Sequence, residues 1–225
     1  MNQQKFILPF YVVTAIYLVA MFANSWIIQL IFKPLLVGSL LYYFIISTRN
    51  YWFYSKKRVV LALIFCILGD IFLSFSFRDE LSFIFGLSAF LIGHIFYILT
   101  YYSFISKERI SWKWHWIAAG FIYFSLSMYF ISQHSAWLKI PVIAYATVIT
   151  VMFILALHLL PIKHLGTEIA FGSALFVLSD TFIALDKFYI PIPHNKWIVM
   201  ITYIAGQYLI VRGITRYIQY KKNKK

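Results

Sequence analysis

The sequence is poor in charge, in acidic residues and in cysteine. Charged residues make up 12% of the 225 residues, and Asp and Glu together number 7. Soluble domains carry about 25% charged residues, so an ordinary soluble fold is excluded. Cys66 is the single cysteine, so no internal disulfide can form. Its place within an apolar run is typical of a small buried hydrophobe.

Long apolar runs take the place of the missing charge. Hydrophobic residues make up 62% of the chain, and a helix that crosses a bilayer needs about 20 of them in succession. The runs predict an all-α, polytopic membrane helical bundle that forms a single transmembrane domain over residues 1–225. The expected helices are residues 6–23, 27–47, 59–77, 81–105, 114–131, 137–160, 166–189 and 196–217.

The cations are distributed unevenly over the loops. With an even number of helices, the larger group lies on the side of both termini: Lys5, Arg49, Lys56, Lys57, Arg58, Lys107, Arg109, Lys113, Lys163, Arg216, Lys221, Lys222, Lys224 and Lys225. The smaller group lies on the other side: Arg78, Lys139, Lys187 and Lys196. This bias predicts cytoplasmic termini in a multi-pass protein of the bacterial inner membrane. The net charge of +13 then indicates contact with anionic membrane lipid, not with nucleic acid.

A few ionisable residues fall inside the apolar runs. A charge near the bilayer centre costs about 3 kcal/mol on insertion scales, so such residues usually face the protein interior and are functional. Asp70 and Asp180 both lie past the middle of helices expected to run outward, which predicts a similar depth for the two carboxylates. Lys33 lies on the helix expected at 27–47. Pairing of an aspartate with Lys33 for helix packing alone is the structural alternative.

Further polar side chains are expected in the same layer. His94 lies near the middle of its helix, with Tyr97 following at helical spacing, and Gln207 has Tyr203 one turn away on the same face. These residues predict a polar cavity inside the bundle. Each also has a structural reading, as a core histidine, a core aromatic or an interhelical hydrogen-bonding amide.

Two carboxylates in a water-poor cavity are suited to acid–base catalysis. Burial and mutual repulsion favour a proton on one, while a nearby cation such as Lys33 keeps the other ionised. A membrane setting favours a lipid substrate. A metal hydrolase needs about three converging ligands, and His94 is the single deep histidine. No metal is therefore expected, although Asp70, Asp180 and His94 could form a poor metal site. Ser179 adjoins Asp180 but belongs to no Gly-x-Ser-x-Gly motif.

The same residues resemble a known family, the YhhN-like membrane proteins, whose characterised members are lysoplasmalogenases. The similarity covers most of the chain. The matching positions are Lys33-Pro34, Gly69-Asp70, Leu73, Phe85-Gly86, Phe90, His94, Tyr97, Gly172, Ala174, Leu175-Phe176, Ser179-Asp180, Tyr203 and Gln207. Where the family has a Gly-Ala pair before the Ser-Asp segment, this chain has Gly172-Ser173-Ala174.

The resemblance implies hydrolysis of the vinyl ether bond of a lysoplasmalogen, a lysophospholipid. The products are a fatty aldehyde and glycerophospho-ethanolamine or -choline. Such a reaction passes through an oxocarbenium ion, as glycoside hydrolysis does. Asp70 and Asp180 are expected to share the acid and base roles, in an order left open. The expected binding or positioning residues are Lys33, His94, Tyr97, Ser179, Tyr203 and Gln207, and no cofactor is expected.

Two other functions stay open. Buried acids also relay protons in transporters, so a proton-coupled carrier of lipids or small molecules is the second hypothesis. The lack of visible inverted repeats argues against it. A membrane scaffold without catalytic activity is the third. The oligomeric state is not indicated, because no clear Gly-x-x-x-Gly face appears.

Overall fold

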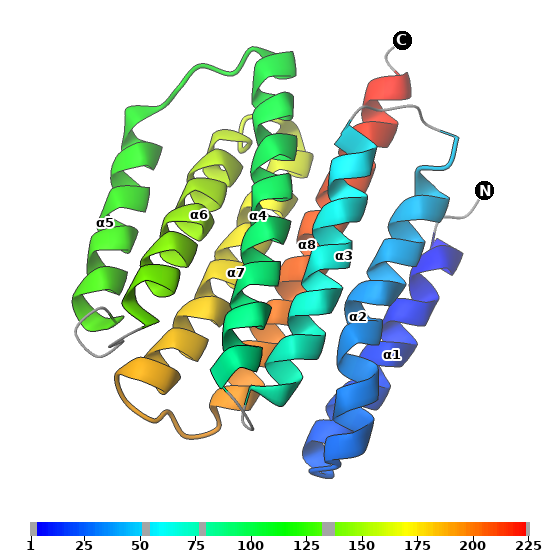
Figure 1. Ribbon diagram of the computed structural model, residues 1–225. Coiled ribbons are helices and arrows are strands. Elements are labelled where there is room, and N and C mark those ends of the chain that lie inside the picture. Colours follow the sequence, from blue (N-terminus) through cyan, green and yellow to red (C-terminus); the bar gives the residue numbers. More distant parts are fainter. Residues whose placement is uncertain (1–3, 51–54, 77–79, 132–137, 224–225) are drawn as a thin grey trace. The chain divides into compact units, whose positions relative to one another are not determined.

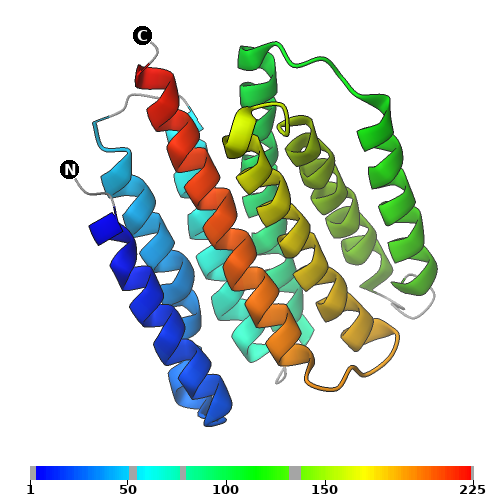
Figure 2. The same ribbon diagram turned by 180° about the vertical axis from the view of Figure 1, so that it is seen from behind.

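The computed structural model describes residues 4–50, 55–76, 80–131 and 138–223. Within these ranges the chain forms eight α-helices and no strand (Figures 1 and 2), which confirms the all-α class. Arg78, Lys224 and Lys225, which entered the charge argument, lie outside the described residues. So do residues 77 and 137, at which expected helices end or begin.

The helix bounds follow the apolar runs. They are α1 (Gln4–Phe22), α2 (Trp26–Ser47), α3 (Ser55–Phe75), α4 (Glu80–Glu108), α5 (Trp114–Ile131), α6 (Lys139–His158), α7 (Lys163–Phe188) and α8 (Asn195–Asn223). Each of these eight is long and apolar enough to cross a membrane, which confirms a multi-pass membrane protein. The largest difference from expectation is α8, which continues beyond residue 217. Hydropathy marks where the apolar run ends, whereas Lys and Arg are good helix formers in water.

A tight turn joins α1 to α2 and makes them antiparallel neighbours. Asn24 has a φ of 51°, and the backbone N–H of Ser25 donates to the carbonyl of Ala20 at 3.0 Å. Asparagine is one of the few residues that adopts this left-handed conformation readily after a helix. The sequence therefore closes the α1–α2 hairpin at Asn24.

The chain divides into two compact units. Unit 1 contains Met1–Phe96 and Tyr217–Lys225, and unit 2 contains Tyr97–Arg216. The division falls inside α4 and inside α8. Unit 1 therefore contains α1, α2 and α3, together with parts of α4 and α8. The single transmembrane domain expected from the sequence stays a prediction.

Unit 1 brings both ends of the described chain to one end of its helices. The side-chain amide of Gln219, near the end of α8, donates to the carbonyl of Ser47 at 3.0 Å, at the end of α2. Because α1 and α2 are antiparallel, the start of α1 lies at this end as well (Figure 1). The cytoplasmic location of this end stays a prediction.

In unit 2, α7 and α8 approach closely at a pair of glycines. A Cβ added to Gly172 would lie 2.8 Å from the carbonyl oxygen of Gly206, and one added to Gly206 would lie 2.9 Å from that of Gly172. Small residues allow membrane helices to pack backbone to backbone. This contact fixes the register of α7 against α8, which run side by side in Figures 1 and 2.

Gly206→Ala is expected to destabilise the protein. The new methyl group would meet the backbone of Gly172 and the amide nitrogen of Phe176 at 3.0 Å, so the helices must separate. Overpacking of this kind costs about 1–3 kcal/mol, measured as a lower thermal unfolding midpoint in detergent micelles. Gly38→Ala is the control, since an added Cβ there meets nothing within 4 Å and alanine favours the helix. Equal midpoints for the two variants would contradict this account of the register.

Candidate active site

Asp70 is a buried carboxylate with a lysine beside it. In unit 1, its side chain on α3 is 1% exposed, and its Oδ1 lies 3.9 Å from the Nζ of Lys33 on α2. The Lys33 side chain is 18% exposed. An ammonium ion close to a buried carboxylate offsets part of the cost of removing both charges from water. The pairing of Lys33 with Asp70 therefore makes an ion pair inside the apolar helices.

Residues of α1, α3 and α4 pack in the region of Asp70 in unit 1. Tyr17 of α1 is buried and interacts electrostatically with Asp70. A Cβ added to Gly69 would lie 2.5 Å from the Phe90 ring, so glycine makes room for that ring against α3. Phe90 in turn stacks on the imidazole of His94, with 6.3 Å between ring centroids. The expected residues Gly69, Asp70, Phe90 and His94 thus belong to one packed region of α3 and α4.

Asp180 accepts a hydrogen bond from a tyrosine that the sequence analysis missed. In unit 2, the hydroxyl of Tyr145 on α6 donates to Oδ2 of Asp180 on α7. Tyr145 is buried and Asp180 is half-buried. The chain has 17 tyrosines, so no single one stands out in the sequence. A spacing signal was also absent, since the two residues lie on different helices.

A second tyrosine supports the next residue on α7. The Tyr123 hydroxyl lies 3.0 Å from Oγ1 of Thr181. Thr181 donates its own hydroxyl hydrogen to the carbonyl of Val177. Tyr123 is therefore the donor to Thr181. Ser179 on the other side of Asp180 donates to the carbonyl of Val199 on α8 at 3.0 Å. Its hydroxyl thus joins two helices, as an alternative to the binding role expected for it.

The amide of Gln207 is held by Tyr97. The Tyr97 hydroxyl donates to Oε1 of Gln207 at 3.1 Å, and both side chains are buried. Tyr97 also stacks on Tyr101, whose hydroxyl lies 3.2 Å from that of Ser173. In the described part of the chain, no acceptor lies within hydrogen-bonding distance of Nε2 of Gln207. Tyr97 and Gln207, expected from the sequence, are thus direct partners.

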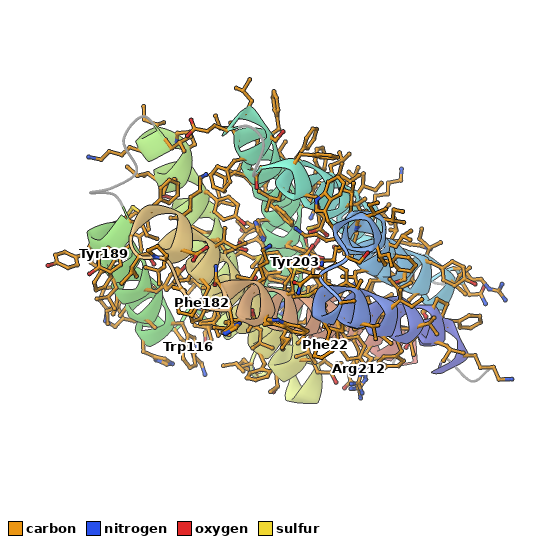
Figure 3. The ribbon with its side chains drawn as sticks, turned by 90° about the horizontal axis from the view of Figure 1, so that it is seen from below. Phe22, Trp116, Phe182, Tyr189, Tyr203 and Arg212 are labelled. Carbon is orange, nitrogen blue, oxygen red and sulfur yellow. The ribbon has the colours of Figure 1, made fainter. Side chains whose placement is uncertain are left out.

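The register of α7 and α8 places Gln207 and Asp180 at different levels. Ser179 is level with Val199, whereas Gly172 is level with Gly206. Gln207 therefore lies roughly 13 Å along α8 from the level of Asp180, at 1.5 Å per residue. Tyr203 is intermediate, since its buried ring packs on Phe176 at 5.4 Å. Figure 3 labels it, together with Tyr189, which is half exposed at the end of α7.

An ion-pair cluster joins α7 and α8 nearer the end of unit 2. The guanidinium of Arg216 donates to Oε1 of Glu168, and Nε of Arg212 lies 3.8 Å from the same oxygen. Both arginine side chains are 42% exposed. The cluster is separate from Asp180, which lies about 18 Å further along α7. Among the described residues, no three His, Cys, Asp or Glu side chains gather as metal ligands do.

Comparisons with known proteins give the family of this chain. A model of the YhhN family matches residues 28–214. The chain belongs to the YhhN family. Lysoplasmalogenase TMEM86A of Homo sapiens is 27% identical to this family member over 214 residues, which cover 91% of the chain and 86% of the relative. Lysoplasmalogenase TMEM86A of Bos taurus is 27% identical over 218 residues, with the same coverage.

A third relative matches over a shorter part of the chain. Lysoplasmalogenase TMEM86B of Sus scrofa is 38% identical over 58 residues, which cover 26% of either chain. No solved structure matches this YhhN family member.

Proposed function

We propose that this protein is a lysoplasmalogenase, an ether-bond hydrolase of the membrane. The observation that carries the proposal is the similarity to relatives named lysoplasmalogenases over 91% of the chain. Eight helices fit to cross a membrane support a substrate drawn from the bilayer. The substrate is then a lysoplasmalogen, and the products are a fatty aldehyde and glycerophospho-ethanolamine or -choline.

The reaction needs one water molecule and proton transfers. An acid protonates the alkene carbon that does not carry oxygen, which leaves an oxocarbenium ion at the other carbon. Water adds there and gives its proton to a base, forming a hemiacetal. The hemiacetal then expels the glycerol oxygen, which takes a proton and becomes an alcohol, while the remaining fragment becomes the aldehyde. Comparable acid–base pairs act on oxocarbenium-like transition states in glycosidases.

Asp70 and Asp180 are the carboxylates we assign to this chemistry. Each belongs to a helix fit to cross a membrane, where a charge is costly and usually functional. Lys33 is paired with Asp70 and either tunes it or binds the lipid phosphate. The residues assigned to positioning water or the glycerol part are His94, Tyr97, Ser179, Tyr203 and Gln207. No cofactor has a role in this scheme, and the proposed location is the bacterial inner membrane with cytoplasmic termini.

The test is release of aldehyde by the purified protein from an alkenyl lysophospholipid in mixed micelles. In D₂O the aldehyde is expected to carry one deuterium on the carbon next to the carbonyl, because protonation of the alkene delivers it there. The acyl lysophospholipid of the same chain length is the matched control, and no fatty acid should be released from it. Absence of aldehyde, or aldehyde without the label, would overturn the proposal.

A further inference from the structure

The hydroxyl of Tyr145 is a direct partner of the Asp180 carboxyl group in unit 2. The tyrosine hydroxyl donates to Oδ2, and the two side chains come from α6 and α7. When Asp180 carries a proton, an oxygen that already accepts a hydrogen bond is best left as the carbonyl, so the proton sits on Oδ1. A carboxylic acid held in this way offers its proton in one direction.

The surroundings of Asp70 indicate which aspartate is the acid and which is the base. Asp70 lies beside the ammonium group of Lys33, which favours its negatively charged form, and a carboxylate takes a proton more readily than it gives one. Asp180 has an uncharged hydroxyl at Oδ2 instead. A neutral donor of this kind is compatible with both protonation states of Asp180, as a group that gives and regains a proton requires.

We propose that Tyr145 is a positioning residue that orients Asp180 as the general acid of vinyl ether cleavage. This inference rests on the proposed function. As the O–H bond of Asp180 breaks, its electron pair stays on the carboxyl group and negative charge develops there. The Tyr145 hydroxyl already points at Oδ2, so its hydrogen bond strengthens as the proton moves to the alkene carbon. An interaction that is stronger in the transition state than in the ground state raises kcat and leaves KM unchanged.

The neighbouring contacts keep this geometry in place. Tyr123 of α5 donates to Thr181, the residue after Asp180, and Ser179 before it donates to the α8 backbone. The segment of α7 around Asp180 is thereby tied to the helices on either side. Asp180 then receives Tyr145 from a fixed direction, as preorganised catalysis requires.

The experiment compares Tyr145→Phe with Tyr101→Phe in the aldehyde-release assay. Both changes remove one buried tyrosine hydroxyl from unit 2, but the Tyr101 hydroxyl contacts Ser173. Tyr145→Phe is expected to lower kcat by about 10- to 100-fold, within the range of a general acid's contribution, with KM changed less than about twofold. Tyr101→Phe is expected to keep kcat within about threefold of wild type, with a similar unfolding midpoint.

Tyr145→His keeps an N–H donor and is expected to recover part of the lost kcat. A purely structural role for Tyr145 predicts the reverse order, because phenylalanine fills the space of the ring better than histidine does. Aldehyde release by wild type with equal kcat for Tyr145→Phe and Tyr101→Phe would overturn this inference alone. No aldehyde from wild type would overturn the proposed function and the inference together.

Discussion

Replacing Asp180 or Asp70 by asparagine is expected to lower the rate of aldehyde release by about 10³-fold or more. Asparagine keeps the shape of the side chain and still accepts the Tyr145 hydrogen bond at position 180. Its amide has no acidic proton to transfer and no negative charge to receive one, and general acid–base catalysis contributes about 10²–10⁴-fold. The measurement is kcat for each purified variant, alongside the amount of folded protein recovered.

Asp186→Asn is the matched control for this prediction. Asp186 lies near the end of α7, where its Oδ1 accepts the backbone N–H of Ile192 at 2.7 Å. The same change of one carboxylate to an amide is expected to leave kcat within about twofold of wild type. If Asp70→Asn and Asp180→Asn were as active as Asp186→Asn, neither residue would be the acid or the base.

The helices were predictable because the bilayer imposes a strong constraint. A crossing helix needs about 20 apolar residues, so each span leaves a run that composition alone reveals. The same constraint makes Lys33, Asp70 and Asp180 conspicuous, since a charge in such a run is costly. The pairing of Lys33 with Asp70 was one of the alternatives that the sequence allowed.

Interhelical register was not predictable in the same way. Gln207 lies near the middle of α8 (Asn195–Asn223), as the sequence indicated, but its level relative to Asp180 depends on how α8 is aligned with α7. The contact of Gly172 with Gly206 sets the register of α7 against α8. The sequence does not show which glycine of one helix contacts which glycine of another. Tyr145 and Tyr123 were missed for a related reason. In the sequence, a tyrosine that contacts a functional residue looks the same as one that only packs in an apolar core.

Lys33→Met is expected to lower the free energy of unfolding by about 3 kcal/mol, because it removes one partner of a buried ion pair. Asp70 would then lie 1% exposed beside a thioether instead of an ammonium ion. The prediction is measured as a fall in the thermal unfolding midpoint in detergent micelles. Lys57→Met, an exposed position at the start of α3, is the control and is expected to change the midpoint little.

Combining Lys33→Met with Asp70→Asn separates the structural part of the pair from the catalytic part. With the charge on Asp70 gone, the remaining site holds no uncompensated ion, so much of the lost stability should return. Activity should not return, because Asp70→Asn also removes the proposed base. A double variant as unstable as Lys33→Met alone would mean that Lys33 stabilises unit 1 through its apolar stem. Stability and activity that recovered together would instead reduce Asp70 to a packing partner of Lys33.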